Sequence, residues 1–207
     1  TALLRAAAAA DPRLRVWAHG ELPAAVALAG RLGWVRGRSL WQMRRPLSGL
    51  GAGSLPEPRL PSGVEVRTFV PGRDERAWLE VNARAFAHHP EQGRTTESDL
   101  LDRERADWFA ADGFFLAFRG ERLVGFHWTK VEDGTAGEVY VLGVDPDEQG
   151  TGLGKALLLV GLRYLARPEL GLSAVTLYVE ADNEPAVGLY RRLGFEHVGT
   201  DTMFHAP

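Results

Sequence analysis

The stretch Gln149-Gly150-Thr151-Gly152-Leu153-Gly154-Lys155 decides the fold of this chain. It follows a β-rich run at 138–144 and opens a leucine-rich segment at 152–166 that predicts a helix. A glycine-rich turn at such a junction points several unpaired backbone N–H groups, at the positive end of the helix dipole, toward one place. The stretch therefore predicts a diphosphate site, although from these residues alone a plain strand-to-helix turn is the alternative.

The spacing of the glycines excludes two familiar nucleotide sites. A Walker loop needs Gly-Lys-Ser/Thr, and this spacing is absent from the stretch. The Rossmann spacing GxGxxG is not satisfied either. Nucleotide hydrolysis and hydride transfer are therefore disfavoured.

Hydrophobic periodicity and turn residues on both sides of the stretch predict alternating strands and helices. Strands are predicted at 64–69, 114–118, 123–130, 138–144, 174–180 and 195–205, and helices at 73–86, 97–108, 152–166 and 184–193. This order predicts an α/β fold with a mixed central β-sheet flanked by helices.

The segment 47–63 is rich in glycine and proline and predicts an inter-domain linker. Before it, residues 14–34 align with residues 177–195, with two more residues in the loop of the first copy. Both copies are predicted to form a strand, a loop and a helix that ends in Leu-Gly-aromatic. We therefore expect residues 1–46 to be the C-terminal remnant of a degenerate domain, and 64–207 to be a catalytic domain of the same fold. Chance similarity of two strand-turn-helix units is the alternative.

The bulk composition restricts the partners. With 24 basic and 27 acidic residues, the formal net charge of -3 gives no electrostatic argument for nucleic acid, so a small molecule is the expected partner. The chain is also expected to be a monomer. The chain has no cysteine, which excludes disulfides and thiolate metal sites and favours a cytoplasmic location.

The N-terminal sequence predicts no targeting segment, and the histidines predict no metal site. Residues 1–10 include five consecutive alanines, but Arg5 interrupts the apolar run and no charged n-region precedes it, so a secretory signal is not expected. No run approaches the ~18 apolar residues of a membrane span, so no membrane partner is expected. His88 and His89 are neighbours and lack a partner at i+4 spacing, so no metal is expected.

Three segments together resemble the GNAT superfamily of N-acetyltransferases. Gln149-x-x-Gly152-x-Gly154 is similar to the signature Gln/Arg-x-x-Gly-x-Gly/Ala, and residues 140–146 resemble the strand that offers backbone groups to the pantetheine arm and the thioester carbonyl. Asn183, Tyr190 and the following Leu-Gly-Phe are similar to the segment N-x(6)-Y-x-x-x-G-F. The resemblance implies a GNAT acyl-CoA N-acyltransferase fold and acetyl-CoA as co-substrate. The implied cofactor-binding residues are Leu142, Gly143, Val144, Gln149, Gly150, Thr151, Gly152, Leu153, Gly154, Lys155 and Asn183.

Within the superfamily, residues 88–93, 125–130, 137–146 and 177–183 resemble the mycothiol synthase family. That family is also a tandem of two GNAT domains. The resemblance implies acetyl transfer to the cysteinyl amine of 1D-myo-inositol 2-(L-cysteinylamino)-2-deoxy-glucopyranoside, which gives mycothiol and CoA. One departure is that most of the N-terminal domain, including a family substrate contact, has no counterpart in this chain.

Two residues are candidates for proton transfer. Strand alternation predicts that Glu138, Tyr140 and Leu142 share one face, and a carboxylate in an otherwise apolar strand should have a raised pKa, so Glu138 is the expected general base. A solvated glutamate at a strand end is the alternative. Tyr190 is the expected acid for the departing thiolate, and a packed core tyrosine is the alternative. Ala29 stands in the aligned place, so the first copy is expected to be catalytically silent.

The remaining roles depend more on the resemblance. Backbone N–H groups at 142–144 are expected to meet the oxyanion. Asn183 is expected to contact the cofactor, to cap the following helix, or both. Glu91, Lys130, Glu138 and Tyr178 are the implied substrate contacts; without the resemblance, Glu91, Lys130 and Tyr178 are ordinary surface residues. Acetylation of another amine, such as a protein N-terminus, and a non-catalytic acyl-CoA-binding module are the alternative functions.

Overall fold

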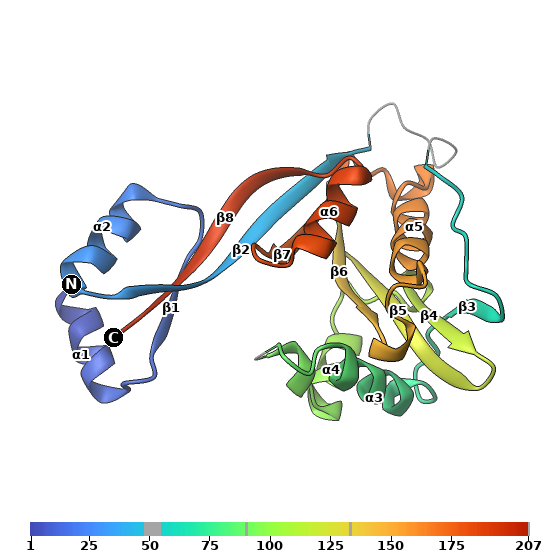
Figure 1. Ribbon diagram of the computed structural model, residues 1–207, viewed down its shortest axis with the longest axis horizontal. Coiled ribbons are helices and arrows are strands. Elements are labelled where there is room, and N and C mark those ends of the chain that lie inside the picture. Colours follow the sequence, from blue (N-terminus) through green and yellow to red (C-terminus); the bar gives the residue numbers. More distant parts are fainter. Residues whose placement is uncertain (48–54, 90, 133, 207) are drawn as a thin grey trace. The chain divides into compact units, whose positions relative to one another are not determined.

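The computed structural model describes residues 1–47, 55–89, 91–132 and 134–206 (Figure 1). Two compact units divide the chain, a smaller one of Thr1–Arg45 with Leu177–Pro207 and a larger one of Pro46–Thr176. The helices are α1 (Ala2–Ala10), α2 (Pro23–Leu32), α3 (Glu75–Ala85), α4 (Glu97–Glu104), α5 (Leu153–Leu165) and α6 (Glu184–Arg192). The strands are β1 (Arg15–Ala18), β2 (Val35–Pro46), β3 (Val64–Thr68), β4 (Phe114–Arg119), β5 (Arg122–Val131), β6 (Ala136–Val144), β7 (Ala174–Glu180) and β8 (Glu196–His205). The short 3-10 turns are η2 (Gln92–Arg94), η3 (Ala111–Gly113), η4 (Pro146–Glu148) and η5 (Pro168–Leu170).

The sheet of the larger unit follows the order β6-β5-β4-β3, and each neighbouring pair is antiparallel. Strands β4, β5 and β6 follow one another through short connections and form a meander, whereas α3 and α4 lie in the chain between β3 and β4. The strand side chains alternate between its two faces. All four of these strands were predicted from the sequence, with ends that differ by at most two residues.

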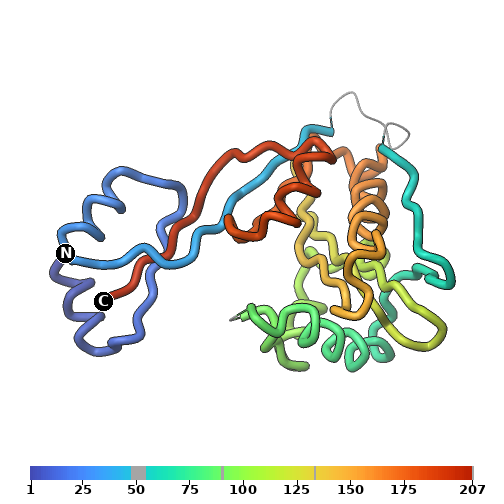
Figure 2. Tube along the Cα trace, viewed as in Figure 1, coloured from blue at the N-terminus to red at the C-terminus, as the bar shows by residue number. Residues whose placement is uncertain are grey.

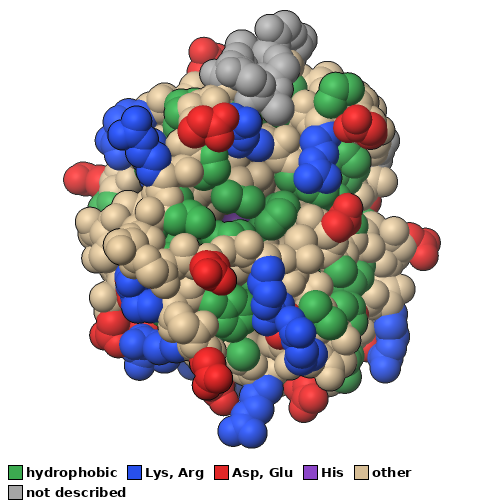
Figure 3. Space-filling model, turned by 90° about the vertical axis from the view of Figure 1, so that its right-hand side faces the viewer, with side chains coloured by type: hydrophobic (Ala, Val, Ile, Leu, Met, Phe, Trp, Pro, Cys, Tyr) green, Lys and Arg blue, Asp and Glu red, His purple; other side chains and the backbone are tan. Residues whose placement is uncertain are grey.

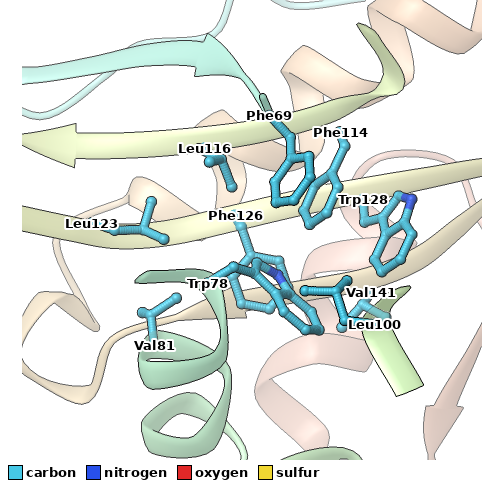
Figure 4. Close-up of a cluster of buried hydrophobic side chains, with 10 residues drawn as sticks. All are labelled: Phe69, Trp78, Val81, Leu100, Phe114, Leu116, Leu123, Phe126, Trp128 and Val141. Carbon is cyan, nitrogen blue, oxygen red and sulfur yellow. The ribbon is translucent and has the colours of Figure 1, made fainter. Parts of the chain in front are cut away.

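One face of this sheet carries an aromatic core (Figure 4). Trp78 from α3 lies against the strand side chains Phe114, Phe126 and Trp128, and the rings of Phe114 and Trp128 stack at 4.4 Å between centroids. Phe69 stacks on the other side of Phe114 at 4.5 Å. The aromatic side chains of the larger unit therefore hold α3 and α4 against this face.

The opposite face of the sheet is covered by α5. Leu153 and Leu157 of this helix are fully buried and pack against Val64, Ala117 and Val124. The leucine-rich helix predicted at 152–166 is confirmed as α5. Because α5 begins at Leu153, inside the glycine-rich stretch, the packing of this helix fixes the position of that stretch.

Helix α4 is shorter than predicted, because it ends at Glu104 rather than at Trp108. Trp108 and the next residue, Phe109, both contact the ring of Trp128. Consecutive residues of a helix point about 100° apart, so both could not reach one ring from a continued helix. Tertiary packing therefore overrides the helical pattern at this end.

The smaller unit is built around β8, which pairs with β1 on one side and β2 on the other, both antiparallel (Figure 2). The strand and the helix predicted in the first copy are found as β1 and α2, and the same elements of the second copy are β7 and α6. Strand β2 was not predicted. Within this unit Arg38 forms an ion pair with Glu180, and Gln42 donates a hydrogen bond to the Tyr178 hydroxyl at 3.3 Å.

Among the described helices, none combines the length and apolar composition needed to cross a membrane. Basic and acidic side chains are interspersed on the face of the molecule shown in Figure 3.

Candidate active site

The glycine-rich stretch forms the turn between η4 and α5. Gly150 has φ 78° and Gly152, which caps the helix, has φ 90°. Residues with a Cβ rarely adopt this left-handed region, so glycine is required at both positions. The first intrahelical bond is donated by Ala156 to the Gly152 carbonyl, and no side chain caps the helix. The N–H groups of residues 153–155 thus have no partner inside the helix, as an anion site requires.

The space around this turn is open. A Cβ at Gly150 or Gly152 would meet nothing within 4 Å. A cavity of about 670 Å³ borders the turn, and two cationic side chains, Arg59 and Lys155, line it. Arg59 was not predicted as a site residue, because it lies in the segment 47–63 that was interpreted as a linker and carries no motif.

Strand β6 contains a β-bulge that the sequence did not reveal. Trp128 pairs with Val141 and Thr129 with Val139, so Tyr140 is the extra residue. Tyr140 and Val141 consequently both pack toward the aromatic core, whereas Leu142 packs on the α5 face. The prediction that Leu142 shares a face with Glu138 and Tyr140 is therefore wrong, because one extra residue inverts the alternation. Bulges disrupt the local hydrogen-bond ladder and occur often beside active sites.

Glu138 and Lys130 are direct cross-strand partners on β6 and β5. The Lys130 ammonium lies 4.8 Å from the centre of the Trp108 ring and 2.6 Å from a Glu132 carboxylate oxygen. The structure thus places two predicted substrate residues, Lys130 and Glu138, side by side. Trp108 was predicted only as a helix residue, and its contact with Lys130 depends on the early end of α4.

The electrostatics at Glu138 are set mainly by its burial. Burial raises the pKa of this carboxyl above its ordinary value of 4.5, the ammonium of Lys130 lowers it, and the carboxylate of Glu132 raises it again. A solvated strand-end glutamate would keep its ordinary pKa. The burial agrees with the desolvated environment that the sequence predicted for this residue.

The smaller unit contains three of the predicted site residues. Asn183 caps α6 by accepting a hydrogen bond from the Ala186 N–H at 3.2 Å, which was one of its two expected roles. Tyr190 is buried with its ring edge-on to Phe195, and burial raises the pKa of its hydroxyl to about 12. Tyr178 is 48% exposed. Packing at Tyr190 is observed, and its catalytic role stays a prediction.

Glu91 and the two histidines lie between α3 and α4. Glu91 is exposed, and its N–H donates to Nδ1 of His89 at 3.3 Å. Among the described residues, no three acidic or histidine side chains are grouped so that they could hold a metal ion. The substrate contact of Glu91 stays a prediction.

Comparison with known proteins places this geometry in a family. Residues 78–195 match the acetyltransferase (GNAT) family. The chain is 59% identical over 198 residues to the mycothiol acetyltransferase of Streptomyces coelicolor, over 95% of this chain and 62% of that protein. It is 54% identical over 200 residues to the mycothiol acetyltransferase of Catenulispora acidiphila, over 94% and 62%. The chain therefore spans less than two thirds of the length of these curated relatives.

Solved structures show the same architecture. A GCN5-related N-acetyltransferase from Sphaerobacter thermophilus has a TM-score of 0.76 at 27% identity, over 94% of this chain and 60% of that chain. A tandem GNAT protein from the clavulanic acid biosynthesis pathway has a TM-score of 0.70 at 20% identity, over 93% and 63%, and shares the fold. The predicted mixed α/β fold and the superfamily resemblance are thus confirmed. The family match covers more than half of the residues and includes the glycine-rich turn, so this chain belongs to the acetyltransferase (GNAT) family.

Proposed function

We propose that this chain transfers an acetyl group from acetyl-CoA to a primary amine, and that the amine is the cysteinyl amine of 1D-myo-inositol 2-(L-cysteinylamino)-2-deoxy-glucopyranoside. The observation that carries the proposal is the course of β6. This strand holds a desolvated carboxylate, Glu138, then a bulge at Tyr140, and leads into a helix whose first N–H groups lack partners. A base on a strand and an anion site at the turn that follows this strand are what acyl transfer to an amine needs.

The cofactor would bind along the end of β6 and the start of α5. The N–H groups of residues 149–155 would hold the diphosphate, and the cations Arg59 and Lys155 beside the neighbouring cavity would bind further phosphate oxygens. Backbone groups of residues 142–144 would hold the pantetheine arm and donate to the oxyanion. Asn183 uses its oxygen for the helix cap, which leaves its amide N–H groups for the cofactor.

Glu138 would remove the proton from the attacking amine. An α-amino group titrates near ~7.7 to 8, so a base with a modestly raised pKa suffices. Four residues of strand separate Glu138 from Leu142, which corresponds to about 13 Å at about 3.3 Å per residue. The bulge at Tyr140 shortens this span, but the spacing still favours proton transfer through a chain of water molecules over direct contact.

Tyr190 would stabilise the leaving thiolate. Its pKa of about 12 lies above the ~8.5 of an ordinary thiol, so complete proton transfer to the sulfur is uphill. We therefore assign the hydroxyl the role of hydrogen-bond donor to the developing thiolate, with solvent as the final proton source.

The acceptor is inferred from the names of the relatives and from three polar side chains. Lys130 is held by the Trp108 ring and by Glu132, so its ammonium lies beside Glu138 and suits hydroxyl groups of a polyol. Glu91 and Tyr178 are the further proposed contacts. We also propose that residues 1–46 are the remnant of a degenerate domain and that residues 47–63 are a linker. The same proposal includes a monomeric state and a cytoplasmic location.

The decisive experiment measures CoA formation by chromatography with three acceptors. These are the cysteinyl-glucosaminyl-inositol, its S-methyl analogue and a peptide with a free N-terminus. The S-methyl analogue controls for acetyl transfer through the acceptor thiol, and the chain itself contributes no thiol because it has no cysteine. Turnover of both glycosides and not of the peptide is expected. Turnover of the peptide alone would show a different acceptor, and binding of acetyl-CoA without turnover of any acceptor would show a non-catalytic module.

A further inference from the structure

Three acidic residues precede the glycine-rich turn. Asp145, Asp147 and Glu148 lie within four positions, directly before Gln149. An unpaired carboxylate beside a diphosphate site would repel the ligand, since like charges in a partly desolvated site interact strongly. This acidic turn, defined as residues 145–148, therefore needs compensation if the next residues are to bind an anion.

Two arginines compensate the first half of the acidic turn. Arg84 of α3 donates to both carboxylate oxygens of Asp145, at 2.8 and 3.0 Å, and to Asp147 at 3.0 Å. Arg122 at the start of β5 lies 2.9 Å from an oxygen of each. Asp145 is 2% exposed, and the hydrogen bond from Arg84 holds its pKa far below its ordinary value. Both carboxylates are thus paired with guanidinium groups.

A third arginine compensates the second half. Arg119 at the end of β4 donates from Nε and Nη2 to the two carboxylate oxygens of Glu148, at 2.7 and 2.8 Å, and from Nη1 to the Ser62 carbonyl. This hydrogen bonding lowers the pKa of Glu148 and raises that of Arg119. Bidentate pairs of this kind fix orientation as well as charge.

The acidic turn is also bonded to the glycine-rich turn that follows it. The Asp147 N–H donates to an Asp145 carboxylate oxygen at 3.0 Å, and the Thr151 hydroxyl donates to the Glu148 carbonyl at 2.7 Å. The side chains that the arginines hold and the backbone that carries the anion site therefore belong to one hydrogen-bonded segment.

We propose that Arg84, Arg119 and Arg122 are positioning residues for the cofactor, which neutralise and fix the acidic turn so that the adjoining backbone N–H groups can accept a diphosphate. The proposal rests on the proposed function, in which the cofactor is acetyl-CoA. Three guanidinium groups face three carboxylates, so the segment presents no net negative charge to the ligand.

The test compares a ligand with a diphosphate, CoA, and one without it, pantetheine, by calorimetry on the whole chain. Arg119→Gln is the informative variant, because the Arg119 side chain is 41% exposed and its loss leaves Glu148 uncompensated. At low salt we expect the Kd for CoA to rise about tenfold and the Kd for pantetheine to stay unchanged. Arg76→Gln is the matched control, because Arg76 forms an exposed ion pair with Glu80 on α3 and should leave both Kd values unchanged.

A double variant separates charge from mere loss of structure. Arg119→Gln with Glu148→Gln removes both charges, and we expect the Kd for CoA to return to within about twofold of the original value. Equal weakening of CoA and pantetheine by Arg119→Gln, or no recovery in the double variant, would overturn this proposal alone. Failure of the unaltered chain to bind CoA would overturn the proposed function as well.

Discussion

Glu138 is the residue on which the proposed chemistry depends most. Its burial raises the pKa of the carboxyl, and a base must be ionised to act, so kcat/KM should fall as the pH is lowered through that raised value. Glu138→Gln should lower kcat by about 10² to 10⁴ and remove this acidic limb. Steady-state rates from pH 5 to 9 measure both effects. An unchanged profile would exclude Glu138 as the base, and Glu65→Gln, at an exposed position of β3, is the control that should change nothing.

At Tyr190, one substitution can distinguish a catalytic role of the hydroxyl from a packing role of the ring. Its ring packs against Phe195, and Tyr190→Phe keeps that contact while it removes the hydroxyl. If the hydroxyl donates to the leaving sulfur, kcat should fall about tenfold or more with the Kd for acetyl-CoA unchanged. Kinetics and calorimetry on the same variant decide this. Equal changes in kcat and Kd would indicate that the residue acts through the structure of the smaller unit.

The buried His127 ring should make the free energy of unfolding decrease at acid pH. The ring is fully buried, its Nδ1 donates to the Leu157 carbonyl at 2.9 Å, and burial lowers its pKa from 6.5 to about 4. The unfolded chain therefore binds the proton more strongly, and stability should decrease as the pH falls from about 6.5 to 4, by about 3 kcal/mol over the whole window. Urea unfolding at a series of pH values measures the slope. In His127→Gln this contribution should vanish, and an unchanged slope would assign it to other groups.

At the scale of elements, replacement of glycine by alanine should have opposite effects on stability at the cap of α5 and inside α2. Gly152 has φ 90°, so Gly152→Ala should destabilise the fold by about 1 to 2 kcal/mol and also weaken CoA binding, since the new methyl group enters the open space above the turn. Gly30 lies inside α2 with nothing within 4 Å of an added Cβ, so Gly30→Ala should stabilise by about 0.5 to 1 kcal/mol and leave CoA binding unchanged. Thermal unfolding and calorimetry check both. A Kd for CoA that does not change in Gly152→Ala would contradict a diphosphate site at the glycine-rich turn.

The same junction shows which elements the sequence can predict. The glycine-rich turn and α5 were predictable because glycine spacing and leucine periodicity are local signals. The bulge at Tyr140 was not, because strand alternation assumes an uninterrupted ladder. The ion-pair partners of Asp145 were not predictable either, because Arg84 lies 61 positions away in the sequence. Glu138 could be found from its strand and its family resemblance, whereas Trp108 came to the site only through tertiary packing that ended α4 early.

At the scale of the whole molecule, the two units predict two unfolding transitions. Helix α1 has no buried residue and α2 buries only Ala29, whereas the larger unit contains an aromatic core and an aliphatic one. Buried apolar area provides most of the stability, so the smaller unit should unfold first on heating. Three tryptophans, at 17, 34 and 41, belong to the smaller unit, and three, at 78, 108 and 128, to the larger one. If the three tryptophans of one unit are replaced by phenylalanine, the remaining tryptophan fluorescence reports on the other unit.

Acetyl-CoA should raise the midpoint of the larger unit, because the glycine-rich turn lies in that unit. Binding to the folded form contributes about 2.7 kcal/mol at a ligand concentration of 100 times Kd, enough to move a midpoint by several degrees. Differential scanning calorimetry together with the two fluorescence variants gives each midpoint with and without ligand. A single transition in the free protein would show that the units unfold cooperatively. An unchanged midpoint of the larger unit would contradict a cofactor site at the glycine-rich turn, because a unit that does not touch the ligand gains no stability from it.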